Sequence, residues 1–351
     1  MNLVRMGLSG LEVSPICLGT MTFGQRTDAK EAARIVAHAR DAGVNFLDTA
    51  DNYVQGESER IVGKIVKRER EHWVLATKAG NTMGVTPLGV HSHDAPPRRG
   101  SSRRGLLRGM DESLARLGTD HVDLWYLHLD DEATPMAETV AAVADVIRAG
   151  KARYWGLSNF RAWRIVEAVK VAEALGAPAP VAVQPYYNAM NRMPEVEILP
   201  ACRHFGLGVV PYSPLARGVL TGKYDPAKPP PGETRAGRKD ARMMQTEFRR
   251  ESLLAAQKIK AHAERKGMTA GQFALLWVLA NRIVTSVLAG PRTLAQWKEY
   301  VAALGHLGKL GPADEKLVDS LVLPGQPSTP GYSDPKYPPN GRAGGLEVCS
   351  G

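Results

Sequence analysis

The repeated occurrence of short apolar segments that end in polar residues is the feature that most restricts the fold of this chain. Eight such segments are present, and most are followed by a stretch with the spacing of an amphipathic helix. Strands that are apolar along their whole length are typical of a sheet that is covered on both faces. The pattern therefore predicts a parallel sheet with helices outside it. The segments are ICLGT, VNFLDT, HWVLATK, VDLWYLH, YWGLSN, VAVQ, LGVVPYS and IVTSVLAG.

The number of these units favours a (β/α)8 TIM barrel, because eight strand-helix units fit a chain of 351 residues. A doubly wound sheet is the alternative. Such a sheet normally carries G-x-G-x-x-G after its first strand, and ICLGTMTFG lacks that motif. Glycines end many of the expected helices, as helix C-termini prefer. They are Gly43, Gly118, Gly150, Gly176 and Gly206.

The sequence predicts one domain with an N-terminal hairpin, an insertion and a C-terminal tail. The first dozen residues predict a β-hairpin before the barrel, and residues 222–250, rich in Pro, Gly and Arg, predict an insertion after strand seven. Residues 1–323 are expected to form a single barrel domain. The Pro- and Gly-rich tail, residues 324–351, is expected to pack as irregular coil or to be mobile.

Composition argues against several classes of protein. The three cysteines, Cys17, Cys202 and Cys349, are odd in number and far apart, so they predict neither a disulfide framework nor a zinc site. No apolar run approaches the roughly 20 residues that a membrane-spanning helix needs. A soluble protein of the reducing cytoplasm is therefore expected, with 44% apolar residues to supply its core.

The net charge of +9 has three interpretations: nucleic-acid binding, an anionic ligand, or a solvated basic surface. The densest basic segment is PPRRGSSRRGLLRG, and it lacks interleaved aromatic residues on which bases could stack. A solvated loop and helix start is the favoured interpretation. No nucleic-acid partner and no membrane partner is predicted.

The polar residues at the strand ends predict an active site. In a barrel, the carboxyl ends of the strands converge on one mouth, where barrel enzymes place their chemistry. Asp48 ends the second strand, Tyr53 follows in its loop, Lys78 ends the third strand and His128 ends the fourth. Alone, Asp48 would more often be a turn residue and Tyr53 a half-buried loop aromatic. Together, these side chains predict a site for proton transfer.

Their chemistry is complementary. A tyrosine with a pKa near 10 is a poor acid at neutral pH unless a cation, here Lys78, favours its ionised form. A buried lysine needs a carboxylate, which Asp48 can supply. His128 can donate a hydrogen bond to a substrate oxygen.

Several motifs make the chain resemble the aldo-keto reductases over roughly residues 3–305. They are FLDTADNY, ATKAG, SLARLGTDHVDLWYLH, GLSNF, PYSPLARGVLTGKY and GPRTLAQWKEY, in that order. The resemblance implies the (β/α)8 barrel and the NADPH-dependent reduction of an aldehyde or ketone, without a metal. It also implies that Asp48, Tyr53, Lys78 and His128 are the catalytic tetrad, with Tyr53 as the proton donor.

The same resemblance implies a set of cofactor-binding residues. Ser158, Asn159 and Gln184 match positions that bind the nicotinamide carboxamide, and Tyr212 matches the aromatic residue that stacks on the nicotinamide ring. The remaining matches are to the phosphates and the adenosine, and Arg235 is expected to lie over the bound cofactor. The matching residues are Ser213, Leu215, Gly218, Lys223, Gly290, Arg292, Gln296 and Glu299. Tyr300 departs from the family, which usually has an asparagine there. This departure affects how the adenine would be bound, and with it the strength of the preference for NADPH over NADH.

The substrate and the oligomeric state are left open. A small-molecule carbonyl compound is expected, in contact with Tyr53 and His128 and with the loop that carries Met21, Thr22 and Phe23. Residues 81–102 and 222–250 are expected to form further pocket walls. Two other functions remain open: a cofactor-binding regulatory subunit with the same fold, and a barrel aldolase in which Lys78 forms a Schiff base.

Overall fold

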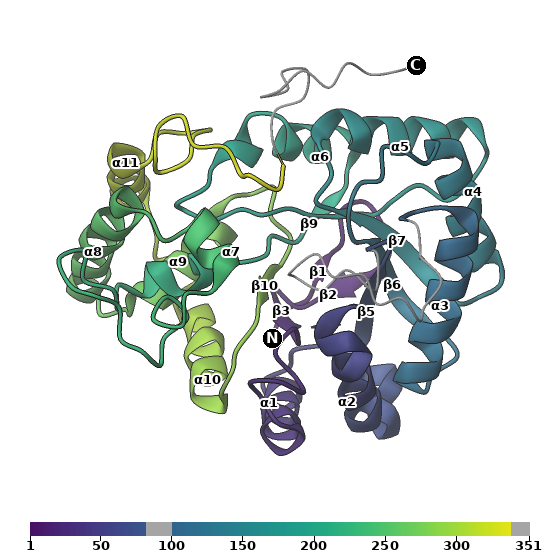
Figure 1. Ribbon diagram of the computed structural model, residues 1–351, viewed down its shortest axis with the longest axis horizontal. Coiled ribbons are helices and arrows are strands. Elements are labelled where there is room, and N and C mark those ends of the chain that lie inside the picture. The colour runs from purple at the N-terminus through teal and green to yellow at the C-terminus, as the bar shows by residue number, and fades with distance from the viewer. Residues whose placement is uncertain (82–99, 338–351) are drawn as a thin grey trace.

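The computed structural model describes residues 1–81 and 100–337. Its central feature is a sheet of eight parallel strands in the order β10-β3-β4-β5-β6-β7-β8-β9 (Figure 1). Parallel bridges from Val209 to Val284 and from Tyr212 to Leu288 connect the two outermost strands, so the sheet closes on itself. The strands are β3 (Ile16–Gly19), β4 (Phe46–Asp48), β5 (Val74–Ala79), β6 (Val122–Leu127), β7 (Ala152–Ser158), β8 (Ala182–Gln184), β9 (Gly208–Val209) and β10 (Val287–Ala289).

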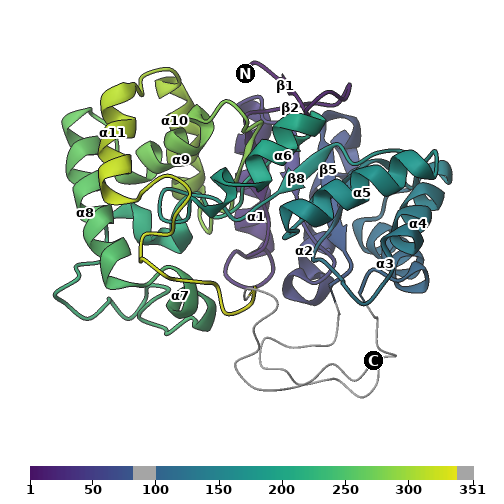
Figure 2. The same ribbon diagram turned by 90° about the horizontal axis from the view of Figure 1, so that it is seen from above.

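Each of the eight predicted segments contains one of these strands, which confirms the (β/α)8 barrel and rules out the doubly wound alternative. The helices lie outside the strands (Figures 1 and 2). They are α1 (Ala29–Asp41), α2 (Glu57–Val66), α3 (Arg103–Leu117), α4 (Met136–Arg148), α5 (Ala162–Ala174), α6 (Ile198–Phe205), α7 (Ala241–Thr246), α8 (Arg250–Arg265), α9 (Ala270–Ala280), α10 (Leu294–Ala303) and α11 (Pro312–Leu321).

Capping residues in the sequence define where several helices begin and end. The Asp28 side chain accepts a hydrogen bond from the backbone of Glu31 and so caps α1, and Thr269 forms a capping box with Gln272 at the start of α9. Gly118 and Gly206 end α3 and α6 with φ of 64° and 65°, a conformation that glycine adopts without a steric penalty.

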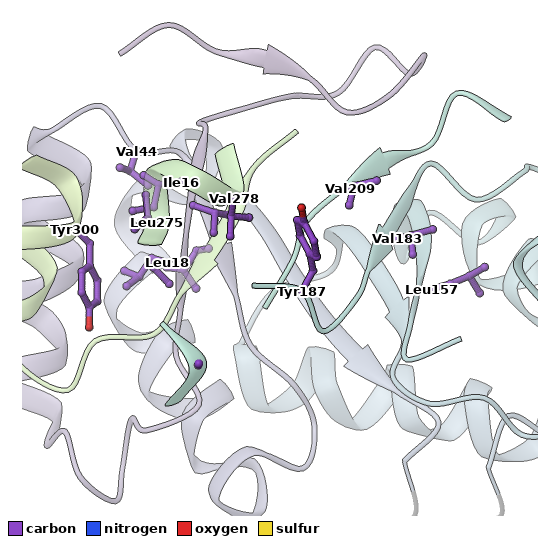
Figure 3. Close-up of a cluster of buried hydrophobic side chains, with 14 of the residues drawn as sticks. Ile16, Leu18, Val44, Leu157, Val183, Tyr187, Val209, Leu275, Val278 and Tyr300 are labelled. Carbon is purple, nitrogen blue, oxygen red and sulfur yellow. The ribbon is translucent and has the colours of Figure 1, made fainter. Parts of the chain in front are cut away.

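Two apolar layers explain why the strands are apolar along their whole length. Side chains that point out of the barrel pack against the helices, as Ile16 and Leu18 of β3 do with Leu275 and Val278 of α9 (Figure 3). Alternate side chains, such as Cys17 between those two, fill the barrel interior. Both faces of each strand are therefore buried.

The predicted hairpin is present as the antiparallel strands β1 (Val4–Arg5) and β2 (Glu12–Val13). Met6 and Val13 belong to the interior cluster, and Gly7 lies directly against Gly208, the first residue of β9. The hairpin therefore covers the amino-terminal end of the barrel and leaves the opposite end for the site.

The predicted insertion contains α7, and the chain after α11 is irregular as far as residue 337. This C-terminal segment (yellow in Figure 2) passes beside α7. The Ser328 amide donates to the Met190 carbonyl at 2.9 Å, and Arg242 of α7 forms a two-pronged ion pair with Asp334. Within the described residues, no helix is both long enough and apolar enough to cross a membrane.

The tightest contact between neighbouring helices yields a test of the packing. A Cβ atom at Gly63 of α2 would lie 2.0 Å from the carbonyl oxygen of Leu117 at the end of α3. We expect Gly63→Ala to lower the free energy of unfolding by about 1–3 kcal/mol, because a backbone atom cannot rotate away. Urea denaturation measures the change. Gly305→Ala is the control, since its Cβ would meet nothing within 4 Å, and equal effects of the two substitutions would contradict the packing argument.

Candidate active site

A cavity of about 430 Å³ opens at the carboxyl ends of the barrel strands. It brings together most of the residues that the sequence singled out, from loops that are far apart along the chain. The predicted residues that line it are Met21, Thr22, Asp48, Tyr53, His128, Ser158, Asn159, Gln184, Tyr212, Ser213, Leu215, Gly218, Lys223, Arg235, Gly290, Arg292 and Gln296.

Lys78 lies beneath the cavity with its side chain fully buried. Its ammonium group is ion-paired with the Asp48 carboxylate, and it donates to the Thr49 carbonyl at 2.8 Å and to the Tyr53 hydroxyl at 3.2 Å. An ammonium group has three protons to donate, and here each has an acceptor. Lys78 is therefore fixed in place, and it contacts the cavity through Asp48 and Tyr53.

The strand register brings these groups together. Asp48 pairs with Ala76 across β4 and β5, two residues before Lys78, so both side chains point into the barrel. Tyr53 follows in a short 3₁₀ turn, where Val54 and Gln55 adopt left-handed backbone conformations with φ of 48° and 54°. Such conformations cost about 1–3 kcal/mol each, most for a β-branched residue. The surrounding structure must impose them, and they orient Tyr53.

The electrostatics of the site follow from its burial. Burial raises the pKa of Tyr53 above its ordinary value, and Lys78 opposes that shift without reversing it. The sequence argument expected the effect of Lys78 to dominate. Burial by itself would lower the pKa of Lys78, but Asp48 and Tyr53 raise it above the usual value, so the ammonium form is retained.

His128 lies next to Tyr53, with the ring centres 5.8 Å apart in an edge-to-face arrangement. Burial, together with the charges of Lys78 and Lys336, lowers the pKa of His128 well below its ordinary value. The imidazole is therefore neutral near pH 7. A neutral imidazole has one N–H group that can donate and one nitrogen that can accept.

A hydrogen-bonded platform adjoins His128. The Asn159 side chain donates to the His128 carbonyl at 2.9 Å and accepts from the Tyr212 hydroxyl at 2.7 Å. The Tyr212 ring stacks on Tyr186 with their centres 5.6 Å apart, and Tyr186 donates to Glu247 at 2.7 Å. The platform thus links the ends of β7 and β8 to the insertion.

Gln184 has a contact that the sequence did not suggest. Its side-chain amide donates to the second oxygen of Asp48 at 3.1 Å. Both oxygens of the carboxylate are therefore engaged, one by Lys78 and one by Gln184. No local pattern in the sequence could have indicated this bond, because the two residues are far apart along the chain.

Two predicted site residues lie elsewhere in the fold. Phe23 is fully buried in the cluster between strands and helices and does not line the cavity, so the structure gives no support to a substrate contact. Glu299 accepts a hydrogen bond from the Thr269 hydroxyl at 2.6 Å and is not among the lining residues. Of the predicted wall 81–102, residues 82–99 lie outside the described residues. Asn81 lines the cavity.

The predicted wall 222–250 contributes Arg242 as well as Lys223 and Arg235 to the lining of the cavity. Other lining residues were not singled out by the sequence analysis. They include Arg26, Asn52, Arg217, Tyr300, Lys336 and Tyr337, of which Tyr300 was noted only as a departure from the family. Arg217 lies inside the motif SPLARGVLTGK and could have been included from its position. Lys336 and Tyr337 belong to the irregular tail, which carries no periodic pattern.

Lys223, Arg235 and Arg292 place several positive charges close together in one part of the cavity. Burial lowers the pKa of Lys223, and the charges of Arg292, Arg238 and Arg235 lower it further. Arg235 is partly compensated, since it donates to Asp240 at 2.9 Å. A cavity wall of mutually repelling cations is stabilised by a bound anion, and phosphate groups are suitable ligands for it.

The buried ion pair can be tested without a substrate. In Asp48→Asn, Lys78 would remain buried without its carboxylate, and we expect a loss of about 3–5 kcal/mol in the free energy of unfolding at neutral pH. The pKa of Lys78 in this folded variant would fall below the unfolded value of about 10.4. The loss should therefore shrink as the pH rises towards that value, because the folded variant sheds the proton first.

Urea denaturation between neutral pH and pH 10 measures this dependence. Asp111→Asn is the matched control, because it breaks the exposed ion pair between Asp111 and Lys151 and should cost only about 0–1 kcal/mol. A loss in Asp48→Asn no greater than the control's would show that the buried pair contributes little.

Comparison with known proteins agrees with this geometry. A model of the aldo/keto reductase family matches residues 15–322. An uncharacterized oxidoreductase, YrpG, of Bacillus subtilis (strain 168) is 37% identical over 87% of this chain and 91% of its own length. Probable voltage-gated potassium channel beta subunits of Oryza sativa subsp. japonica and Arabidopsis thaliana are 35% and 34% identical, each over 92% of this chain and 97% of their own lengths. The chain belongs to the aldo/keto reductase family.

Proposed function

We propose that this protein is an oxidoreductase that reduces the carbonyl group of an aldehyde or ketone with NADPH. The observation that carries the proposal is the Tyr53 hydroxyl, which lies at the cavity and accepts a hydrogen bond from the buried Lys78 ammonium, itself paired with Asp48. Such a chain of groups suits a side chain that must give up a proton and be stabilised as an anion.

The cavity suits a phosphate-bearing cofactor. Lys223 and Arg292 face it without an ion-pair partner among the described residues, and Arg235 lies beside them. These cations would hold the phosphates, with Arg292 at a 2′-phosphate. Ser158, Asn159 and Tyr212 would bind the nicotinamide end, near Tyr53 and His128. When bound, NADPH supplies the hydride.

The residues of the chain would then act on the substrate oxygen. Tyr53 donates its proton to that oxygen as negative charge develops there. Its raised pKa keeps the phenol protonated at neutral pH, and the fixed ammonium group of Lys78 stabilises the phenolate that remains. The neutral His128 directs the carbonyl oxygen towards Tyr53 with its N–H group.

A regulatory subunit is the second candidate, because two of the relatives are named as potassium channel beta subunits. It predicts cofactor binding with little turnover of any carbonyl compound. The aldolase is disfavoured, since the Lys78 nitrogen is buried and all three of its protons have acceptors. Turnover by the wild type, measured as NADPH absorbance loss over a panel of aldehydes and ketones, separates the first two functions.

Removal of the Tyr53 hydroxyl tests the assigned proton donor. We expect Tyr53→Phe to reduce turnover by about 10²- to 10⁴-fold, the range typical of a general acid, while NADPH binding changes little. Steady-state kinetics measures the first effect and quenching of tryptophan fluorescence by NADPH the second. Turnover close to that of the wild type would remove Tyr53 from this role.

The cofactor preference depends on Arg292. Loss of a charge-assisted contact to the 2′-phosphate should weaken NADPH binding to Arg292→Ala by about 1.5–3 kcal/mol and leave NADH binding almost unchanged. Fluorescence titration with both nucleotides measures the difference. Arg108→Ala on α3, which removes an exposed ion pair with Glu112, is the control. Equal weakening of both nucleotides would assign Arg292 to the adenine or to the fold.

A further inference from the structure

The cations that line the cavity differ in how they are compensated. Arg217 donates to Glu247 at 2.9 Å, Arg242 is paired with Asp334, and Arg235 donates to Asp240. Lys336 also lines the cavity, but no carboxylate of the described residues pairs with its ammonium group. Its charge is thus available to a ligand.

Lys336 lies on the His128 side of the cavity. Its charge acts on His128, whereas the cations that act on Lys223 are Arg292, Arg238 and Arg235. The positive charges that act on Lys336 itself are those of Arg242 and Arg217, which are already paired with Asp334 and Glu247. Lys223, Arg235 and Arg292 are assigned above to the phosphates of the cofactor, whereas Lys336 lies nearer His128, where the carbonyl substrate would bind.

The position of Lys336 is built into the fold. The Asp334 carboxylate, held by Arg242, also accepts the backbone N–H of Lys336 at 2.9 Å. The guanidinium of Arg249 lies over the ring of Tyr332, 3.7 Å from its centre. The backbone amide of Ser328 donates a hydrogen bond to the carbonyl of Met190, in the loop between β8 and α6. These contacts fix the segment that leads to Lys336.

We propose that Lys336 binds a carboxylate group of the substrate, so that the protein prefers carbonyl compounds that carry an acid group. This inference rests on the proposed function and names the substrate class of the same site. The carbonyl oxygen would lie at Tyr53 and His128, and the carboxylate at Lys336. A single ammonium group matches the charge of a monoanionic carboxylate, while a phosphate usually recruits arginine or several donors.

A matched pair of substrates tests the proposal. 4-Carboxybenzaldehyde and its methyl ester present the same aromatic carbonyl group with and without the negative charge. We expect wild-type kcat/KM to be higher for the acid, and the acid-to-ester ratio to fall about ten- to a hundredfold in Lys336→Met. Lys336→Arg should retain most of the preference. Lys170→Met, on the exposed face of α5, is the control and should keep the wild-type ratio.

The outcomes separate this inference from the proposed function. An equal ratio in the wild type and Lys336→Met overturns the carboxylate site while carbonyl reduction stands. A large loss of NADPH affinity in Lys336→Met also overturns it, because Lys336 would then serve the cofactor phosphates. If neither aldehyde turns over, the proposed reduction fails for these probes. Binding of benzoate to the NADP⁺-saturated protein then tests the carboxylate site without turnover. Binding that is weakened by Lys336→Met supports the proposal, and equal binding refutes it.

Discussion

The ion pair between Lys78 and Asp48 is the interaction on which the rest of the site depends. Both side chains are removed from water, which is unfavourable for two isolated charges unless the geometry is close and the remaining hydrogen-bonding groups are satisfied. The structure meets both conditions through Thr49, Tyr53 and Gln184. The pair and these partners come from the ends of β4, β5 and β8, so the pair requires an intact barrel.

The barrel also maintains unfavourable backbone conformations around the cavity. Non-glycine residues with positive φ occur beside Tyr53 and at the ends of β7 and β9, among them Asn159 with φ of 62° and Ser213 with φ of 58°. Each is disfavoured by itself. The closed sheet and its two apolar layers supply the rigidity that holds them, which suits reactive side chains that lie in the last residues of strands or directly after them.

The segments outside the barrel repeats complete the cavity. Glu247, fully buried after α7, accepts from both Tyr186 and Arg217, and so joins the insertion to the platform beneath Tyr212. Arg242 of α7 holds the C-terminal segment through Asp334. The insertion therefore acts as the link between the barrel strands and the tail, and it positions groups that neither part could place alone.

The sequence by itself determined the barrel and the meeting of Asp48, Tyr53, Lys78 and His128. Strand and helix periodicity are local properties, and the convergence of parallel strand ends follows from the fold class without further information. The tertiary structure decided the rest. The Phe23 side chain is buried in the core because its loop packs against α2. Burial has a larger effect than Lys78 on the pKa of Tyr53. Lys336 reached the cavity through contacts such as the one between Arg242 and Asp334, 92 residues apart. Such contacts leave no periodic trace in a sequence, because they depend on where two irregular segments meet after the chain has folded.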